Sequence, residues 1–258
     1  MEKLLEKKTA IITGAANGVG QIISQKFSEE GANLILADMD ESNLKKEADL
    51  IRKSGSHVEI FCGDLRQNLT IKNLLALSTK TFKNIDILVN ASRQVTISHP
   101  LDSDDMFFEE LMSQNVGVNL KLSREVAKKM IAQNVSRPES GNTIGSIVNL
   151  SSIASHRTLP DTLAYSVSSA ALDQLTKSMA ISLAESKIRV NAVAIGSVMS
   201  SSLRAKLAKN KFVLEDLIAA TPLGRLGEAS EAAEAVLFLA SEKSSFITGT
   251  ILTVDGGR

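Results

Sequence analysis

The sequence of 258 residues has one cysteine, no formal net charge and no long apolar run. The lone Cys62 excludes an internal disulfide and favours a reducing, cytoplasmic setting. The 29 basic and 29 acidic residues balance, so charge gives no indication of nucleic-acid binding. No apolar stretch approaches the roughly 20 residues that cross a bilayer, and the N-terminal MEKLLEKK lacks the apolar core of a secretion signal. No group of His, Cys or acidic residues has metal-ligand spacing. We therefore expect a cytoplasmic protein without membrane, nucleic-acid or metal partners.

Short β-branched apolar runs alternate with longer helical patterns along the chain. The runs that predict strands are Thr9–Thr13, Asn33–Asp38, His57–Cys62, Ile85–Asn90, Gly145–Leu150, Arg189–Ala194 and Thr250–Val254. The helical patterns between them include Gly18–Glu30, Ser42–Lys53, Met106–Ala132 and Leu163–Glu185. This alternation is typical of a parallel sheet with helices on both faces. No segment resembles an interdomain linker, and the polar stretch Asn134–Asn142 indicates a surface loop. Residues 1–258 are therefore expected to form one α/β domain.

A glycine-rich segment, Thr13 to Gly20 (TGAANGVG), joins the first predicted strand to the first predicted helix. Glycines at this place let backbone N–H groups and the helix N-terminus approach a pyrophosphate closely. An ordinary tight turn would also use glycine. The position directly between strand and helix, however, is the one that dinucleotide binding requires. The segment therefore predicts a dinucleotide site.

Asp38 ends the second predicted strand, about twenty residues beyond the glycines. A carboxylate there can accept hydrogen bonds from the adenosine ribose, and it would repel a 2′-phosphate. The neighbouring Met39 and the loop residue Asn17 carry no charge that would attract such a phosphate. The alternative role for Asp38 is to cap the helix that follows. The pattern favours NAD(H) over NADP(H).

The predicted helix Leu163–Glu185 and the strand before it carry a candidate acid–base pair. Tyr165 and Ser169 are four residues apart and therefore lie on one face of the helix. Ser152 lies thirteen residues before Tyr165 and follows an apolar run that ends at Leu150. A hydroxyl at a strand end that faces a phenol at a helix start could exchange a proton with a bound substrate.

These motifs, in this order, resemble those of the short-chain dehydrogenase/reductase family over almost the whole chain, with the 3-oxoacyl-carrier-protein reductases among the similar members. Thr13, Gly14, Gly18 and Gly20 match the family's glycine motif, and Ile247–Gly257 (ITGTILTVDGG) resembles its last strand and subunit-contact tail. The resemblance implies a three-layer Rossmann fold, with a doubly wound parallel sheet of about seven strands. It also implies NAD(P)(H), a small carbonyl or alcohol substrate and a homotetramer.

The resemblance assigns roles to individual residues. Ser152 and Tyr165 match the catalytic serine and tyrosine, Asn115 matches an asparagine that orders a water in the proton relay, and Asp64 matches an acid that contacts the adenine. The implied cofactor-binding positions are Gly14, Asn17, Gly18, Val19, Gly20, Asp38, Asp64, Leu65, Asn90, Ser92, Gly196 and Val198. In the implied tetramer, Met106–Ala132 and Leu163–Glu185 would pack against a neighbouring subunit.

The catalytic motif departs from the family pattern at one position. The family has Y-x-x-x-K, and Ser169 stands in place of the lysine. In the family that lysine favours the ionised tyrosine and binds the nicotinamide ribose. A free tyrosine ionises near pH 10, and a serine is too short and uncharged to supply the missing cation. Lys177 lies more than three helical turns beyond Tyr165, so only a residue from elsewhere, such as Lys121, could replace it.

The cofactor-binding motifs also depart from the family pattern. The family's N-N-A-G is Asn90-Ala91-Ser92-Arg93 here, which puts a large cation where a glycine lies against the cofactor. Arg93 could clash with the adenosine half, turn outward or contact a phosphate. The family's P-G is Ile195-Gly196, and Ser200 replaces a threonine while keeping its hydroxyl.

Two functional hypotheses result. The first is an atypical, weakly active NAD(H)-linked alcohol dehydrogenase or carbonyl reductase, in which Tyr165 exchanges the proton, Ser152 holds the carbonyl oxygen and Asn115 supports a water. Neutral tyrosine is abundant at pH 7 and tyrosinate is scarce, so activity should favour reduction and oxidation should rise with pH. The second is a non-catalytic dinucleotide-binding regulatory or structural subunit.

The substrate pocket is less well specified. The segments expected around its mouth are Gln94–Pro100, Ala154–Thr162 and Val198–Asp216, with His99 and His156 as candidate polar residues. The last segment carries four cations that would either meet an acidic substrate or carrier or form a solvated helix face: Arg204, Lys206, Lys209 and Lys211.

Overall fold

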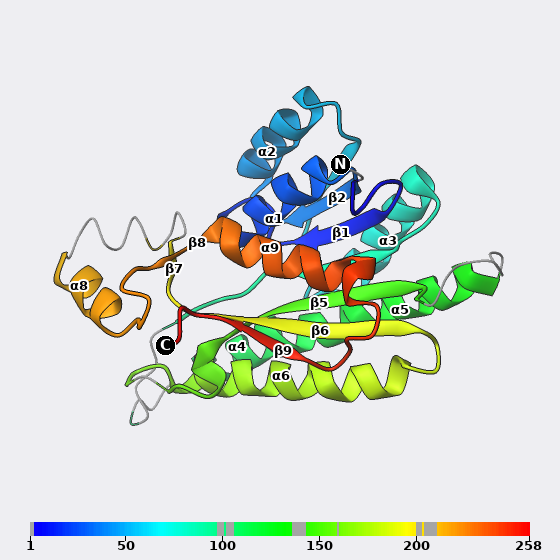
Figure 1. The fold of residues 1–258 in the computed structure, drawn as a ribbon. Coiled ribbons are helices and arrows are strands. Elements are labelled where there is room, and N and C mark those ends of the chain that lie inside the picture. Colours follow the sequence, from blue (N-terminus) through cyan, green and yellow to red (C-terminus); the bar gives the residue numbers. More distant parts are fainter. Residues whose placement is uncertain are drawn as a thin grey trace.

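A computed structural model describes residues 3–96, 101, 106–135, 143–158, 160–199, 203 and 211–258. Seven strands form one parallel sheet in the order β3-β2-β1-β4-β5-β6-β9 (Figure 1). Their bounds are β1 Thr9–Thr13, β2 Asn33–Asp38, β3 Val58–Cys62, β4 Ile87–Asn90, β5 Gly145–Ser152, β6 Ile188–Ile195 and β9 Ile251–Val254. Two short strands, β7 (Val198–Met199) and β8 (Gly227–Glu228), pair separately.

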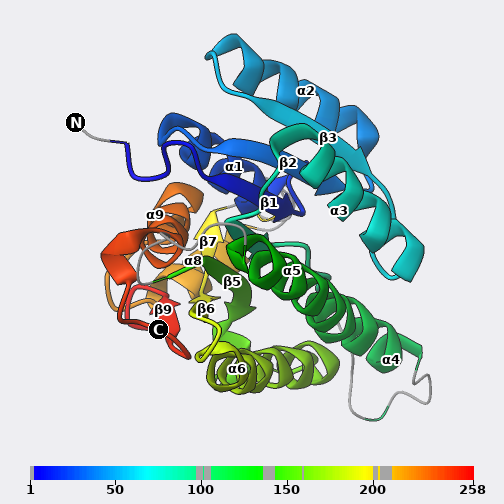
Figure 2. The same ribbon diagram turned by 90° about the vertical axis from the view of Figure 1, so that its right-hand side faces the viewer.

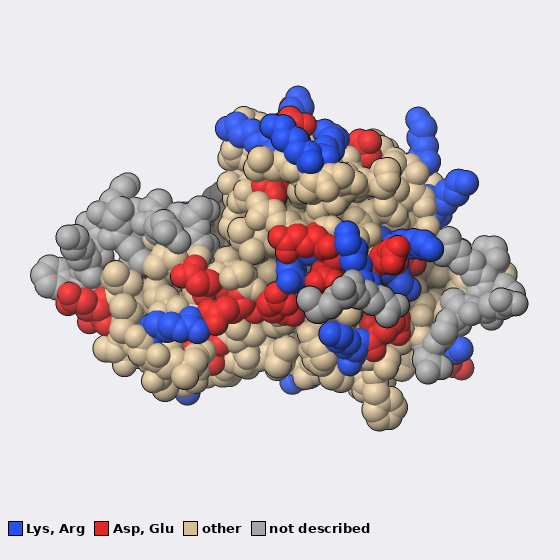
Figure 3. Space-filling model, turned by 45° about the horizontal axis from the view of Figure 1, so that its top comes forward, with Lys and Arg blue, Asp and Glu red and all other residues tan. Residues whose placement is uncertain are grey.

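Helices cover both faces of the sheet (Figure 2). One face packs against α1 (Gly18–Glu29), α2 (Glu41–Lys53) and α9 (Ala229–Ala240). The other packs against α3 (Asn68–Phe82), α5 (Val118–Val135) and α6 (Leu163–Leu183). In the view of Figure 3, acidic and basic side chains are interspersed on the surface. The shorter α4 (Met106–Met112) precedes α5, and α8 (Lys211–Ala219) lies near β7 and β8. This arrangement confirms the expected three-layer Rossmann fold.

The central strands are apolar on both faces because each face meets a layer of helices. In β1, Ala10 and Ile12 belong to the core beneath α1 and α9, whereas Ile11 belongs to the core beneath α3 and α5. All five residues of β1 are buried. Such strands form continuous apolar runs in the sequence, which explains why the predicted strands fall within two residues of the observed ones.

The expected helix Met106–Ala132 is wrong as a single element. The structure has α4, then a five-residue π-helical segment (Ser113–Gly117), then α5. The π segment widens the turn around Asn115, and such bulges are frequent at functional sites. Figure 2 shows α4 and α5 on the same side of the sheet as α6. None of the helices in the described part of the chain is long and apolar enough to cross a membrane.

The strand order reverses between β1 and β4, whose carboxyl ends point to the same edge of the sheet. In open α/β sheets ligands bind in the crevice at this switch point. The β1–α1 loop, the segment after β4 and the end of β5 meet there.

Candidate active site

The three glycines of the β1–α1 loop are required for three different reasons. Gly14 has a positive φ of +65° and lies so close to the segment after β4 that an added Cβ would be 2.8 Å from the Ser92 Cα. A Cβ on Gly20 would collide with the Gly14 carbonyl oxygen. Gly18 also has a positive φ, +61°, but its side-chain position faces open space. The loop is therefore packed on its protein side and open where a ligand would lie.

The N-terminus of α1 is available to bind an anion. Asn17 occupies the N-cap position, but its side chain makes no capping hydrogen bond, and no acidic residue lies in the first turn. The Asn17 amide instead donates to an oxygen of Asp40, at 3.5 Å. The first N–H groups of a helix have no intrahelical acceptor and attract phosphate groups. Gly18, Val19 and Gly20 supply those groups here.

Asp38 faces the glycine loop. Its Oδ2 accepts a hydrogen bond from the Ala16 N–H at 3.1 Å, and its Oδ1 accepts from the Met39 N–H at 2.7 Å. The capping role belongs to Asp40, which accepts from the Asn43 N–H and whose pKa is lowered chiefly by that hydrogen bond. Asp38 is thus not the helix cap that the alternative interpretation required. Its carboxylate lies where a carboxylate can meet an adenosine ribose.

Hydrogen bonds to the Thr13 side chain, at the end of β1, hold the segment after β4 in place. The Thr13 hydroxyl accepts hydrogen bonds from the Ala91 and Ser92 N–H groups, both at 3.1 Å. Asn90, expected at the cofactor, is fully buried, and its amide donates to Ser123 and Asn149. Any contact from Asn90 to a cofactor must therefore come from its backbone.

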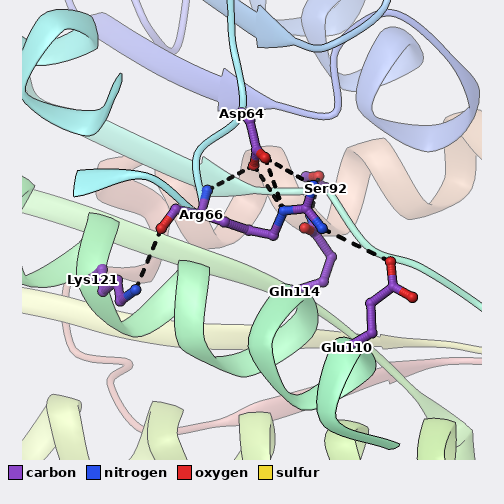
Figure 4. Close-up of polar contacts among 6 residues, drawn as sticks. All are labelled: Asp64, Arg66, Ser92, Glu110, Gln114 and Lys121. Carbon is purple, nitrogen blue, oxygen red and sulfur yellow. Dashed lines mark hydrogen bonds and ion pairs between the residues drawn. The ribbon is translucent and has the colours of Figure 1, made fainter. Parts of the chain in front are cut away.

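The Arg66 side chain forms an ion pair with the carboxylate of Asp64 (Figure 4). The Arg66 guanidinium donates to both Asp64 oxygens at 2.8 to 3.0 Å, and this lowers the pKa of Asp64. Glu110 lies 3.8 Å from the same guanidinium. Sequence reasoning missed Arg66, although its position two residues after the acid was a usable signal. An adenine amino group would compete with Arg66 for Asp64.

Lys121 does not serve Tyr165. Its ammonium donates to the Arg66 carbonyl oxygen at 3.4 Å, and Figure 4 shows it beside the Asp64–Arg66 pair. Nearby, the Gln114 amide donates to the Ser92 hydroxyl at 3.2 Å. The prediction that Lys121 could reach Tyr165 is therefore wrong.

Of the other predicted cofactor residues, Leu65 and Val198 have buried side chains. Leu65 and Ile195 are buried core side chains. Gly196 lies so close to the chain end that an added Cβ would be 2.6 Å from the Asp255 Cβ. Val198 borders a cleft of about 480 Å³ between Pro222–Gly227 and Thr253–Gly257.

Tyr165 and Ser152 come from neighbouring elements. Tyr165 lies in the first turn of α6 and is only 8% exposed. Ser152 is the last residue of β5, is 6% exposed, and its hydroxyl accepts from the Ala154 N–H at 3.2 Å. That bond caps the short 3₁₀ turn Ile153–Ser155, which packs against α6. The turn therefore fixes the end of β5 relative to the start of α6.

Ser169 does not face the phenol. Its hydroxyl donates to the Tyr165 carbonyl oxygen at 2.8 Å, and the Ser168 hydroxyl donates to the same oxygen at 3.0 Å. Both bonds lie within α6, so they hold the helix and leave the tyrosine hydroxyl without a partner from position 169.

Asn115, in the π segment, clamps the chain that follows Arg93. Its Oδ1 accepts from the Gln94 N–H at 2.8 Å and its Nδ2 donates to the Gln94 carbonyl at 3.0 Å. The same amide donates to Ser168 at 3.2 Å, and the Asn115 carbonyl accepts from Asn119 at 2.8 Å. The side chain expected to order a water thus holds protein backbone.

Arg93 points to Tyr165. Its Nη1 atom donates to the Tyr165 hydroxyl oxygen at 3.0 Å and to the Ser151 carbonyl oxygen at 3.1 Å. None of the three alternatives that the sequence offered for the Arg93 side chain was a contact with Tyr165. The two residues are 72 positions apart in the sequence, so no local pattern indicated their contact.

Several predicted residues lie outside the described part of the chain. They are Ser200, His99, Arg204, Lys206, Lys209, most of the loop Asn134–Asn142 and parts of the three expected pocket segments. His156 is exposed and bonds its neighbour Ser155. In the described ranges no group of three or more His, Cys, Asp or Glu side chains could hold a metal ion.

The family model described as Enoyl-(Acyl carrier protein) reductase matches residues 14–258. A galactitol 2-dehydrogenase (L-tagatose-forming) from Cereibacter sphaeroides is 32% identical over 254 residues, which is 98% of this chain and 95% of that protein. A solved short-chain type dehydrogenase/reductase from Mycobacterium marinum is 30% identical, with a TM-score of 0.89, and the match covers 99% of this chain and 97% of that one. The chain belongs to the short-chain dehydrogenase/reductase family.

A second solved relative shows what a member of this family binds. It is a 7α-hydroxysteroid dehydrogenase in complex with NADH and 7-oxo glycochenodeoxycholic acid. It is 29% identical to this short-chain dehydrogenase/reductase, with a TM-score of 0.91 over 99% of this chain and 96% of that one. The relatives are thus oxidoreductases that act on alcohols and carbonyls, and the fold that holds NADH there is the fold of this chain.

Proposed function

We propose that this short-chain dehydrogenase/reductase interconverts a small carbonyl compound and its alcohol with NAD(H). The observation that carries the proposal is the meeting of an open glycine loop with the Tyr165–Ser152 pair at one edge of the sheet. Gly18 faces open space, and the N-terminus of α1 is uncapped by its own side chain. The residues present therefore fit a dinucleotide, with its pyrophosphate at Gly18–Gly20 and its adenosine ribose at Asp38.

The chemistry assigned to the chain is proton exchange. In reduction, the Tyr165 hydroxyl donates a proton to the substrate oxygen, and the Ser152 hydroxyl hydrogen-bonds to that oxygen. In oxidation the same oxygen of Tyr165 accepts the proton back. The dinucleotide supplies or removes the hydride when it is bound. Asn115 contributes by fixing Gln94 and Ser168 around this pair.

The preference for NAD(H) rests on the surroundings of Asp38. Its carboxylate would repel a 2′-phosphate. The two lysines early in α2 have other partners, since Lys45 pairs with Glu41 at 2.6 Å and Lys46 donates to Asn43 at 3.3 Å. Met39, the residue after Asp38, is an exposed apolar side chain. No cation among these residues compensates for the repulsion.

Assembly into a homotetramer is part of the proposal. Large apolar side chains are exposed on the two helices expected at the subunit contacts: Phe107 and Phe108 on α4, and Leu163, Val167 and Ile181 on α6. Phe246, near the chain end, is fully exposed. Apolar patches of this kind mark protein–protein contacts. Sedimentation analysis of the purified chain tests this part directly.

The non-catalytic hypothesis has support of its own. The motif lysine is absent, and Arg66 holds the carboxylate that would meet the adenine. The two hypotheses are separated by measuring NADH and NADPH binding calorimetrically and then assaying turnover across ketones, sugars and ketoacyl thioesters.

Turnover that disappears in Tyr165→Phe, while NADH binding persists, supports the oxidoreductase. NADH binding without turnover on any substrate supports the regulatory subunit. An absence of binding to either dinucleotide contradicts both. Ser182→Ala, an exposed hydroxyl near the far end of α6, is the matched control and should leave binding and turnover unchanged.

A further inference from the structure

The Arg93 guanidinium is the charged group that contacts the Tyr165 hydroxyl. Its Nη1 atom is 3.0 Å from the phenolic oxygen and 3.1 Å from the Ser151 carbonyl oxygen. Both contacts are hydrogen bonds in which the guanidinium donates. Arginine stays protonated at any pH at which a protein is folded, so the phenolic oxygen faces a permanent positive charge.

The backbone on either side of Arg93 is fixed. Ser92, before it, donates its N–H to the Thr13 hydroxyl at 3.1 Å. Gln94, after it, is clamped through both its N–H and its carbonyl by the Asn115 side chain. The anchors come from β1 and from the π segment, two elements far apart in sequence. Arg93 therefore extends toward Tyr165 from a segment that is held at both ends.

The charge of Arg93 is not neutralised within the described part of the chain. The guanidinium has no carboxylate partner there, because its hydrogen bonds go to the Tyr165 hydroxyl and the Ser151 carbonyl oxygen. The nearby Asp64 and Glu110 pair with Arg66 instead. Ser169, at the family's lysine position, donates its hydroxyl hydrogen bond to the Tyr165 carbonyl oxygen. The cation at the phenol thus comes from the β4 side of the site and not from α6.

We propose that Arg93 replaces the missing lysine by stabilising negative charge on the Tyr165 oxygen. During reduction Tyr165 gives its proton to the substrate oxygen, and the phenolate left behind is stabilised by the guanidinium until solvent returns a proton. During oxidation the same charge favours the phenolate that accepts the proton from the alcohol. This role rests on the proposed function, and it removes the expectation that the missing lysine penalises oxidation. Arg93 is a positioning residue in this scheme because it acts through Tyr165.

The competing outcome is obstruction. A large side chain that crosses the site toward Tyr165 could instead exclude the nicotinamide end of a dinucleotide, which would make Arg93 a plug. The two roles predict opposite effects of removing the guanidinium on binding and catalysis. Removing the guanidinium weakens catalysis if it assists Tyr165, and it strengthens binding and catalysis if it blocks the site.

The composition of the chain allows a direct test that does not require turnover. Tyr165 is the only tyrosine and there is no tryptophan, so the near-ultraviolet absorbance of phenolate reports on this residue alone. The titration is made on the folded parent and on Arg93→Lys, Arg93→Leu and Arg93→Gly. Arg52→Leu, which removes a half-exposed guanidinium at the end of α2, is the matched control.

We expect the phenolate signal to develop at higher pH in Arg93→Leu and Arg93→Gly than in the parent, and at nearly the parental pH in Arg93→Lys and Arg52→Leu. Circular dichroism checks that each variant is folded. Two uncharged variants are used so that, if one fails to fold, the other still tests the proposal. Identical titrations in the parent and in both uncharged variants would overturn the proposal.

The kinetic arm separates this proposal from the proposed function. With a substrate in hand, Arg93→Leu should lower kcat for oxidation by at least about tenfold at pH 7, with the loss shrinking as pH rises and the phenol ionises without help. Arg93→Lys should recover most of that loss. A parent that shows no turnover defeats the proposed function, yet the absorbance titration still decides the proposal about Arg93. Tighter NADH binding and faster turnover in Arg93→Gly would identify the plug and overturn the assisting role.

Discussion

The Ser169 hydroxyl lies 2.8 Å from the carbonyl oxygen of Tyr165, four residues earlier on the same helix. Serine at this place in a helix often bonds backward in this way, so the side chain turns toward its own backbone and away from the phenol. The Ser169 side chain therefore bonds within α6, and the phenol of Tyr165 is contacted by Arg93 instead. The cation at Tyr165 is the Arg93 guanidinium.

Restoring the family residue alone should fail. In Ser169→Lys, the new ammonium shares the site with the Arg93 guanidinium, and two nearby cations repel each other. We expect this variant to gain no turnover, whereas Arg93→Gly/Ser169→Lys, which rebuilds the family pattern at both positions, should turn over at least as fast as the parent. Steady-state assays with and without the second substitution measure this. A large gain in Ser169→Lys by itself would mean that position 169 is the limiting defect and that Arg93 contributes little.

Removing Arg66 should strengthen dinucleotide binding. Arg66→Ala frees the Oδ2 atom of Asp64 for an adenine amino group, while the backbone N–H of residue 66 still donates to Oδ1. One recovered hydrogen bond corresponds to a tightening of about fivefold in the NADH Kd. Calorimetry on the parent and the variant measures it. Lys121→Ala, which loses only the contact to the Arg66 carbonyl, should bind as the parent does. If Arg66→Ala binds more weakly, the guanidinium itself is part of the adenine site.

Asp38 should set the dinucleotide preference. In Asp38→Ala the carboxylate that would repel a 2′-phosphate is gone, so the ratio of NADPH to NADH affinity should rise, mainly because NADH binding weakens. Competitive binding of the two dinucleotides gives the ratio. Asp40→Ala is the contrasting variant, since it removes the cap of α2 and should lower thermal stability without changing the ratio. Equal effects of the two substitutions on the ratio would contradict a specific role for Asp38.

The sequence was informative where the cause of structure is local. The β1–α1 loop could be predicted because its glycines adopt positive φ or make close backbone contacts that no other residue allows. The strands could be predicted because burial on both faces leaves continuous apolar runs. The sequence alone could not decide whether Asp38 caps the next helix, since Asp40, two residues later, is the same residue type and could cap it equally well. The structure shows that Asp40 is the cap.

The parts that could not be predicted depend on contacts between distant segments. Arg93 meets Tyr165 across 72 residues, and its direction is set by the clamp of Asn115 on Gln94. The π segment that presents Asn115 has no recognised sequence signature and was absorbed into one long predicted helix. Side-chain direction at a crowded site follows from packing, which a linear pattern does not contain.

Arg189 should be among the most sensitive positions for stability. It is a buried residue of β6, and its guanidinium donates to the Leu239 and Ser241 carbonyl oxygens and to the Ser244 hydroxyl at 2.8 to 3.0 Å. Burial lowers its pKa, but the hydrogen bonds cap the end of α9. Arg189→Leu removes the hydrogen bonds of a buried charged donor, while Ser146 and Ser244 still donate to the Leu239 carbonyl oxygen and Ser244 to that of Ser241. We therefore expect a loss of about 1.5–3 kcal/mol in the free energy of unfolding by urea. An exposed-site control, Arg124→Leu, should change it little, and a similar loss in both would point to a general effect of removing arginine.

Glu231 should give a pH-dependent contribution that ends in acid. Its carboxylate accepts from both Arg225 nitrogens at 2.7 Å and from the Glu228 N–H at 2.8 Å, and the Arg225 hydrogen bonds are the main cause of a pKa lowered from 4.5 to about 2. Because the folded-state pKa lies below the unfolded one, the stabilisation is fully present above about pH 4.5 and is lost as the pH falls toward 2. Urea midpoints of the parent and Glu231→Gln should therefore differ at pH 6 and converge between pH 4.5 and 2. The difference should be small and should shrink with added salt, since the pair is solvent-exposed. Glu215→Gln on α8 is the control, and a difference for Glu231→Gln that stays constant from pH 6 to 2 would show that the charge of Glu231 is not what stabilises the start of α9.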